Sequence, residues 1–202
     1  MNEAGIGLPP EMIAAYILAG GRSRRMGEAK SDLLLNGEPV VRQIAARIRD
    51  QVASVRLVMK PDAGPTVHGL SVVHDAGTDT ALVHGIRAAL AEPGPDWRWV
   101  LACDMPLVNG SVLRGLWEAA QSAGAPGACV LLPGRDEPDP LPSLWHRDIA
   151  RRIDLAWGLI ARDWLRLADL AVWHVAAPQT ACFENLNTQA AWQDFRRRHE
   201  GA

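Results

Sequence analysis

The residues with the clearest chemical potential form a glycine-rich, cationic loop directly after an apolar run. Residues 14–18 are apolar and predict a buried strand, which leads into glycines at positions 20, 21 and 27. Among these glycines lie four cationic side chains: Arg22, Arg24, Arg25 and Lys30. Glycine lets backbone N–H groups approach an anion closely, and the cations supply charge that the amides lack. The loop is therefore typical of a polyphosphate-binding site.

Two common phosphate-binding loops do not fit this segment. The dinucleotide fingerprint needs Gly-x-Gly-x-x-Gly, and the P-loop needs Gly-Lys-Ser/Thr after four intervening residues; neither pattern occurs here. The simpler alternative is a tight turn at Gly20 and Gly21 with a solvated basic rim, because such dipeptides follow many strands.

Two further motifs carry polar groups that could serve the same site. Residues 97–103 predict an apolar, aromatic-rich strand, and Asp104 follows it at once, before Pro106. Open α/β sheets bind ligands at this carboxyl edge, although a lone Asp there is often only a cap or turn residue. Residues 183–188 read Phe-Glu-Asn-Leu-Asn-Thr, in which Thr188 is expected to N-cap the last helix.

The three motifs together resemble those of the nucleotidyltransferases that are similar to molybdenum cofactor guanylyltransferase. The matching patterns are Leu-Ala-Gly-Gly-x-Ser-x-Arg-Met-Gly-x-x-Lys at 18–30, Cys-Asp-x-Pro at 103–106 and Asn-x-Asn-Thr at 185–188. They occur in the family's order and span residues 16–188, nearly the whole chain. The resemblance implies transfer of GMP from GTP to molybdopterin, with release of pyrophosphate and with Mg²⁺ as cofactor, in molybdenum cofactor biosynthesis.

The resemblance also implies roles for individual residues. Asp104 is expected to hold the magnesium ion, while Lys30 and Arg25 offset charge on the phosphates. The residues expected to bind the nucleotide are Leu18, Ala19, Gly20, Gly21, Arg22, Ser23, Met26, Gly27, Lys30, Asp75 and Gly85. The residues expected to bind the molybdopterin-type acceptor are Asn185, Asn187 and Ser143. Ser143 lies in a segment similar to the family's Pro-Leu-x-x-Leu-Tyr, with Trp145 in place of Tyr.

Departures from the family pattern leave the choice of base open. Ala29 stands where many relatives have Asp, and residues 80–85 keep only Leu82 and Gly85 of the family's Gly-Pro-Leu-x-Gly segment. Cytidylyl transfer to the same pterin is one alternative, although relatives with that activity usually have Leu-Ala-Ala-Gly at the loop. A second alternative is a sugar-1-phosphate nucleotidyltransferase, although these enzymes are commonly longer. A third alternative is a catalytically inactive nucleotide-binding partner protein. The retained Asp104 and Lys30 argue against this third alternative.

The elements that must position these residues alternate between strand and helix. This order predicts an α/β fold: a three-layer α/β/α sandwich with a mostly parallel, doubly wound sheet. The resemblance implies a nucleotide-diphospho-sugar transferase-like arrangement. We expect a loose leader over residues 1–11 and a single domain over 12–202. Strands are predicted at 14–19, 54–59, 70–74, 97–103, 128–132, 141–145 and 172–176, and helices at 39–50, 80–92, 111–123, 148–170 and 188–199.

Composition narrows the possible partners and surroundings. The net charge of −2 supplies no field for nucleic acid, and no apolar run approaches the roughly 18 residues that cross a bilayer. Three distant cysteines favour reduced thiols in a cytoplasmic protein, and the six histidines lack zinc-ligand spacing. The tryptophans indicate core packing: Trp97 and Trp99 on one strand face, and Trp157 with Trp164 along a helix. We expect transient contact with a molybdoenzyme or a cofactor-insertion protein.

Overall fold

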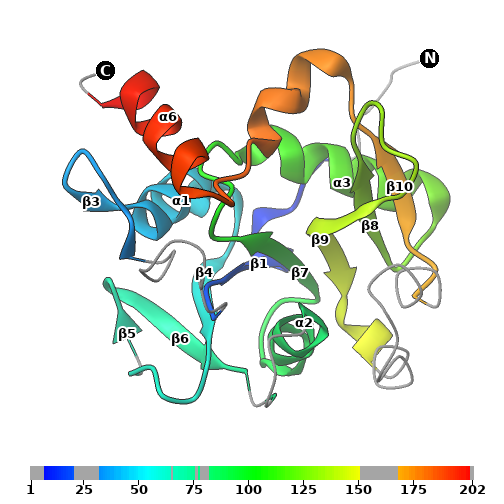
Figure 1. Ribbon diagram of the computed structural model, residues 1–202. Helices are drawn as coiled ribbons and strands as arrows, with labels where there is room; N and C mark the ends of the chain where they lie inside the picture. The colour runs from blue at the N-terminus through cyan, green and yellow to red at the C-terminus, as the bar shows by residue number, and fades with distance from the viewer. Residues whose placement is uncertain are drawn as a thin grey trace.

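The computed structural model describes residues 7–20, 32–64, 66–75, 77, 82–150 and 168–200. Its centre is an eight-stranded sheet with the strand order β10-β8-β9-β7-β1-β4-β6-β5 (Figure 1). The strands are β1 (Ile13–Leu18), β4 (Ser54–Met59), β5 (Thr66–Val67), β6 (Leu70–His74), β7 (Trp97–Ala102), β8 (Gly127–Leu131), β9 (Asp139–His146) and β10 (Ala171–His174). Strands β7, β1, β4 and β6 are mutually parallel, as are β8 and β10. Strand β9 is antiparallel to both of its neighbours, and β5 is antiparallel to β6.

Helices cover both faces of this sheet. The helices are α1 (Val40–Ile48), α2 (Leu82–Ala91), α3 (Gly110–Ala123) and α6 (Gln189–His199), with 3₁₀ turns at Pro10–Met12, Arg49–Gln51, Arg147–Ile149 and Ala177–Phe183. Strand side chains alternate between faces, so Ile13 and Ile17 pack with α1, α3 and α6, while Tyr16 packs with α2. Figure 1 shows α2 on one side of the sheet and the other three helices opposite. The predicted three-layer, mostly parallel architecture is confirmed.

The ends of several elements follow directly from their residues. The Asn109 side chain accepts a hydrogen bond from the Ser111 amide at 2.9 Å and so caps α3, which ends at Gly124 in the left-handed region. The Thr188 hydroxyl accepts one from the Ala191 amide at 3.1 Å, which confirms the predicted cap of the last helix. Strands β4 and β6 have the predicted bounds.

Short elements were missed by the sequence pattern. Residues 34–39 form a hairpin of β2 (Leu34–Leu35) and β3 (Glu38–Pro39), closed by Asn36 and Gly37 at φ 53° and 78°. Because Pro39 still pairs in this hairpin, α1 begins at Val40.

Most of the helix expected at 148–170 lies outside the described residues, namely 151–167, which include Trp157 and Trp164. Before this gap, a 3₁₀ turn at Arg147–Ile149 is followed by the helical residue Ala150, and after it residues 168–169 form a turn.

The aromatic core and the cysteines follow the sequence-based expectations. Trp97 and Trp99 are buried in the core on one face of β7. On β10, Trp173 packs so closely on α3 that a Cβ at Gly115 would lie 2.3 Å from its ring. All three cysteines are free thiols. Within the described ranges, no helix is long and apolar enough to cross a membrane.

Candidate functional site

Four parallel strands bring the predicted polar residues to one edge of the sheet. In the register of β1, Leu18 is opposite both Val58 of β4 and Ala102 of β7, and in the next pair Met59 is opposite His74. The residues that follow these strands are Ala19 and Gly20, Lys60, Asp75, and Cys103 with Asp104. They therefore gather at a single carboxyl edge, the usual place for ligands in such sheets.

Backbone hydrogen bonds hold the first residues of the phosphate loop against both neighbouring strands. The Ala19 amide donates to the Val58 carbonyl at 2.9 Å, and the Cys103 amide donates to the Leu18 carbonyl at 3.2 Å. The remainder of the expected phosphate loop, with Gly21, Arg22, Ser23, Arg25, Met26, Gly27 and Lys30, lies outside the described residues.

The backbone after β4 closely approaches Gly20 and leaves little room for a side chain there. A Cβ there would lie 3.3 Å from the backbone nitrogen of Lys60 and 3.4 Å from Cα of Met59. Backbone atoms at the end of a central strand have little freedom to move away. Glycine therefore allows the loop to leave the sheet directly beside β4.

The turn that carries Asp104 is supported from two sides. The Arg47 guanidinium of α1 donates to the Pro106 carbonyl, and burial lowers the pKa of Arg47. From the other side, the Leu186 amide donates to the Asp104 carbonyl at 2.8 Å. The turn is thus fixed by groups that come from distant parts of the sequence.

The Leu186 contact brings Asn185 and Asn187 to the Asp104 turn. Leu186 is fully buried, so it anchors the segment, while Asn187 is exposed. The side-chain oxygen of Asn185 is buried and has no hydrogen-bond partner in the described part of the chain. A buried polar atom without a partner is costly in a native protein, so this oxygen is a candidate ligand-binding atom.

These groups fit a magnesium ion. Mg²⁺ is bound by oxygen atoms, usually one or two carboxylates together with substrate phosphates and water. Asp104 supplies a carboxylate, and Asn185, whose neighbour Leu186 bonds to the Asp104 carbonyl, supplies a buried amide oxygen. Across the described ranges there is no cluster of three or more His, Cys, Asp or Glu residues that could hold a metal.

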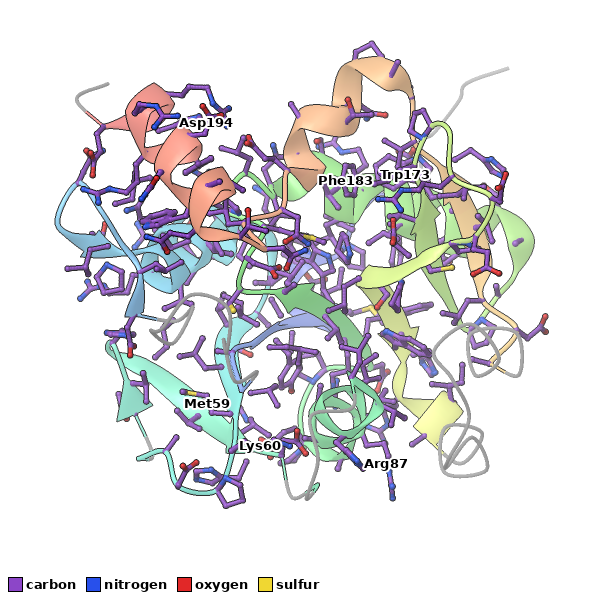
Figure 2. All side chains as sticks on the ribbon, in the orientation of Figure 1. Met59, Lys60, Arg87, Trp173, Phe183 and Asp194 are labelled. Atoms are coloured by element: carbon purple, nitrogen blue, oxygen red, sulfur yellow. The ribbon has the colours of Figure 1, made fainter. Side chains whose placement is uncertain are left out.

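Asp75 lies at the same edge in a network that the sequence did not indicate. It is 7% exposed and accepts hydrogen bonds from Lys60 Nζ at 2.9 Å and from the Gly77 amide at 2.8 Å. Lys60 also donates to the Gly77 carbonyl at 3.0 Å. Figure 2 labels Met59 and Lys60 at the end of β4, near α2. The available signal for Lys60 was its place directly after a predicted strand.

The two other expected residues lie in packed positions. Gly85 is buried in α2, and a Cβ there would lie 3.0 Å from Cδ2 of Leu18, the last residue of β1. Ser143, expected on the acceptor side, is fully buried in β9, where its hydroxyl accepts a hydrogen bond from Trp145 Nε1 at 2.7 Å.

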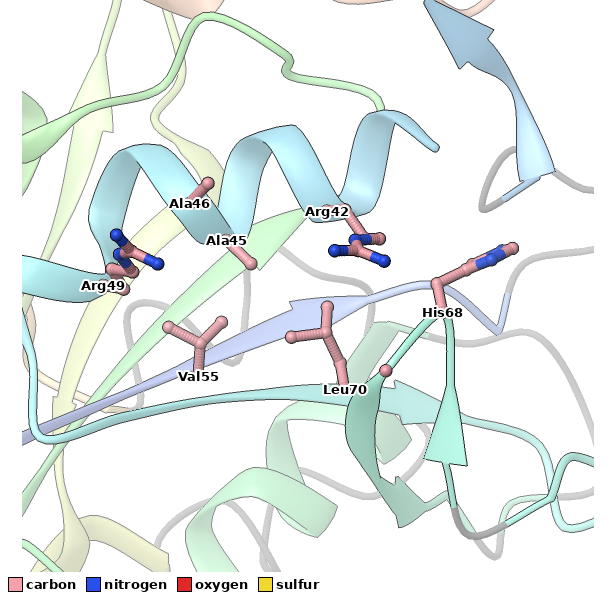
Figure 3. A pocket seen from close by; sticks show the side chains of 8 residues that line it. Arg42, Ala45, Ala46, Arg49, Val55, His68 and Leu70 are labelled. Atoms are coloured by element: carbon pink, nitrogen blue, oxygen red, sulfur yellow. The ribbon is translucent and has the colours of Figure 1, made fainter. Parts of the chain in front are cut away.

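A pocket of about 350 Å³ lies away from these residues, against α1 (Figure 3). It is lined by Arg42, Ala45, Ala46, Arg49, Val55, His68, Gly69 and Leu70. Val55 and Leu70 are near the amino ends of β4 and β6, opposite the edge with Lys60 and Asp75. The polar lining residues contact carboxylates: Arg42 pairs with Glu38 at 3.3 Å, Arg49 pairs with Asp50 at 3.6 Å, and His68 Nε2 lies 2.9 Å from Asp32 Oδ1. None of the predicted site residues lines this pocket.

Comparison with known protein sequences gives one consistent relationship. A sequence model of the MobA-like NTP transferase domain matches residues 15–174. The chain is 33% identical over 180 residues to the molybdenum cofactor guanylyltransferase of Cereibacter sphaeroides, covering 85% of this chain and 89% of that protein. It is 34% identical over 184 residues to the enzyme of the same name from Rhodobacter capsulatus, covering 87% and 90% of the two chains.

Solved structures show the same fold. The molybdopterin-guanine dinucleotide biosynthesis protein A of Archaeoglobus fulgidus superimposes with a TM-score of 0.72 at 22% identity, covering 92% of this chain and 97% of that one. The 2-C-methyl-D-erythritol 4-phosphate cytidylyltransferase of Thermus thermophilus gives a TM-score of 0.68 at 21% identity, covering 92% and 98%. The nucleotide-diphospho-sugar transferase-like fold expected from the sequence is thereby confirmed.

Proposed function

The chain belongs to the MobA-like NTP transferase family, and on this premise we propose that it transfers GMP from GTP to molybdopterin with release of pyrophosphate. The observation that carries the proposal is the meeting of Gly20, Asp104 and Asn185 at one sheet edge. Sequence identity of 33–34% to enzymes named molybdenum cofactor guanylyltransferase supports the particular donor and acceptor.

The reaction needs positioning and charge neutralisation more than covalent catalysis. A phosphate oxygen of the acceptor forms a bond to the α-phosphorus of GTP, and the bond to the bridging oxygen of the β-phosphate breaks. The chain's own contribution is to align the two phosphates and to stabilise charge on the leaving pyrophosphate. Backbone amides at Gly20 and Gly21 would hold the phosphates, while Lys30 and Arg25 would offset their charge.

Magnesium is the cofactor we propose for this site. The Asp104 carboxylate would hold it, with the buried amide oxygen of Asn185 as a second donor on the acceptor side. When bound, the ion would neutralise charge on the triphosphate and withdraw electrons from the reacting phosphate. The fixed turn at Asp104 supports this role, because its backbone is held by both Arg47 and Leu186.

The preference for one nucleotide base depends on two segments of the chain. The Leu-Ala-Gly-Gly turn at 18–21 is retained, whereas the family's Gly-Pro-Leu-x-Gly segment is altered at 80–85. His84 is buried in α2 next to Gly85, and its polar ring lies against the backbone of Gly77. We expect GTP to be preferred by a smaller margin than in typical relatives, because a site rejects a base mainly through polar groups left unpaired.

Calorimetric titration with GTP, CTP and ATP in the presence of Mg²⁺ tests this assignment. The proposal predicts the tightest binding for GTP. Tighter binding of CTP would favour cytidylyl transfer to the same acceptor, and no binding of any nucleotide would favour an inactive partner protein. We further propose that the protein acts in the cytoplasm, where transient contact with a molybdoenzyme or a cofactor-insertion protein would deliver the product.

A further inference from the structure

We infer that Lys60 is a positioning residue for the nucleotide, acting through Asp75 and the turn at Gly77. The inference rests on the proposed function, because it assigns the nucleotide to this edge of the sheet. Neither the motifs nor the family pattern points to Lys60. Its role is apparent only from the network that the fold assembles between β4 and β6.

The network fixes both oxygens of the Asp75 carboxylate. Lys60 Nζ donates to Oδ2 at 2.9 Å, and the Gly77 amide donates to Oδ1 at 2.8 Å. A carboxylate oxygen has two acceptor positions, so each can still accept a hydrogen bond from a ligand. Asp75 is therefore held in one orientation while remaining able to bind the hydroxyl or amine donors of a nucleoside.

Lys60 also connects this carboxylate to the phosphate loop. Its backbone nitrogen lies 3.3 Å from the position of a Cβ at Gly20, the residue at which the loop leaves β1. The Asp75 amide donates to the Met59 carbonyl at 2.7 Å, directly before Lys60. The Lys60 backbone thus lies beside Gly20 while its side chain binds Asp75, so Lys60 links the start of the phosphate loop to the Asp75 carboxylate.

The turn at Gly77 is held from the opposite side as well. Lys60 Nζ donates to the Gly77 carbonyl at 3.0 Å. A Cβ at Gly77 would lie 2.3 Å from Cγ of His84, so the imidazole of α2 packs against the Gly77 backbone. The segment that departs from the family pattern therefore contacts the Lys60 network through His84.

An ion pair on β4, the strand that Lys60 directly follows, provides a matched control. Arg56 pairs with Glu92, and its side chain is 33% exposed, compared with 23% for Lys60. Arg56 is opposite Tyr16 in the sheet register, upstream of the carboxyl edge. Loss of the Arg56–Glu92 pair should lower the stability of the fold in the same manner as loss of the Lys60–Asp75 pair. It should not change the affinity for GTP.

The experiment measures GTP binding by calorimetry, and the thermal unfolding midpoint, for the wild type and for Lys60→Met, Lys60→Arg, Asp75→Asn and Arg56→Met. Lys60→Met is expected to weaken GTP binding about tenfold, as supporting residues commonly do. Lys60→Arg should recover most of the affinity. The double variant Lys60→Met/Asp75→Asn should bind GTP no more weakly than Asp75→Asn alone, because both changes disrupt the same Lys60–Asp75 interaction. Arg56→Met should lower the unfolding midpoint without weakening GTP binding.

Three outcomes would overturn the inference. Wild-type affinity in Lys60→Met would show that the network does not position the nucleotide. An equal loss of GTP affinity in Arg56→Met would show a general stability effect. Absence of GTP, CTP and ATP binding in the wild type would remove the proposed function and this inference together, whereas the first two outcomes leave the proposed function intact.

Discussion

The Leu186 amide donates a hydrogen bond to the Asp104 carbonyl at 2.8 Å, which joins the end of β7 to the segment before α6. Leu186 is fully buried, so the contact is anchored in the core and not only at the surface. It places Asn185 beside the Asp104 turn, although the two residues are far apart in the sequence. The residues that we propose for the metal and for the acceptor can thus be held by one backbone contact.

Replacement of Asp104 should abolish turnover while leaving the fold intact. The backbone of the turn is held by Arg47 and Leu186, so Asp104→Ala keeps these supports. Removal of a charge-stabilising group at the reacting phosphates costs on the order of 100-fold or more in rate. Pyrophosphate release and circular dichroism should be measured on the same preparation. Near-normal release from the folded variant would refute the role.

Asn185→Ala separates a ligand role from a structural one. Because the Asn185 oxygen makes no hydrogen bond in the described part of the chain, its loss should change the unfolding free energy by less than about 1 kcal/mol. The Mg²⁺ concentration required for half-maximal turnover should rise. A large loss of stability with an unchanged magnesium requirement would instead indicate a structural role.

Gly20→Ala should weaken nucleotide binding because the new methyl group meets backbone atoms of β4 at 3.3 Å and 3.4 Å. The matched control is Gly64→Ala, where the nearest atom is the Thr66 carbonyl oxygen at 3.8 Å. GTP affinity of the two variants, measured by calorimetry, should differ about tenfold or more, which corresponds to roughly 1.4 kcal/mol. Equal affinities would mean that close approach at Gly20 is not required.

Stability should fall at alkaline pH through Cys129. Burial raises the pKa of this thiol from 9.0 to about 11 in the folded protein. A raised folded pKa means that the stability contribution is complete below pH 9 and is lost as pH rises toward 11. The loss is about 1.4 kcal/mol per pH unit at most.

Urea unfolding at about pH 8 and about pH 10.5 measures this loss. Cys129→Ala removes the titrating thiol and should show a smaller decline between the two conditions. Some decline should remain, because burial also raises the pKa of Tyr16. An identical decline in both proteins would assign the alkaline effect to other groups.

Elements and caps that depend on local residue pattern could be predicted from the sequence. Contacts between residues that are brought together by the order of strands in the sheet could not. Strand alternation located β4 and β6, and Thr188 was recognised as a cap from its residue type. The Lys60–Asp75 pair depends on β4 and β6 being neighbours in the sheet, which no local pattern encodes. The short motif around Ser143 likewise predicted a strand but did not indicate that its side chain is fully buried in β9.

The hairpin at residues 34–39 was missed for a different reason. Its strands have two residues each, too few for alternation to be detected, although Asn36-Gly37 is a common turn sequence. By contrast, the carboxyl edge was predictable because each motif follows a strand and parallel strands end together.

Guanylyl transfer can be measured by incubating the purified protein with Mg²⁺, molybdopterin and each of GTP, CTP and ATP. Pyrophosphate release and the mass of the pterin product are recorded together. We expect the fastest release with GTP and a product heavier by one GMP unit, with one pyrophosphate formed for each product molecule. Faster release with CTP, or a pterin that stays unmodified while GTP is present, would contradict it.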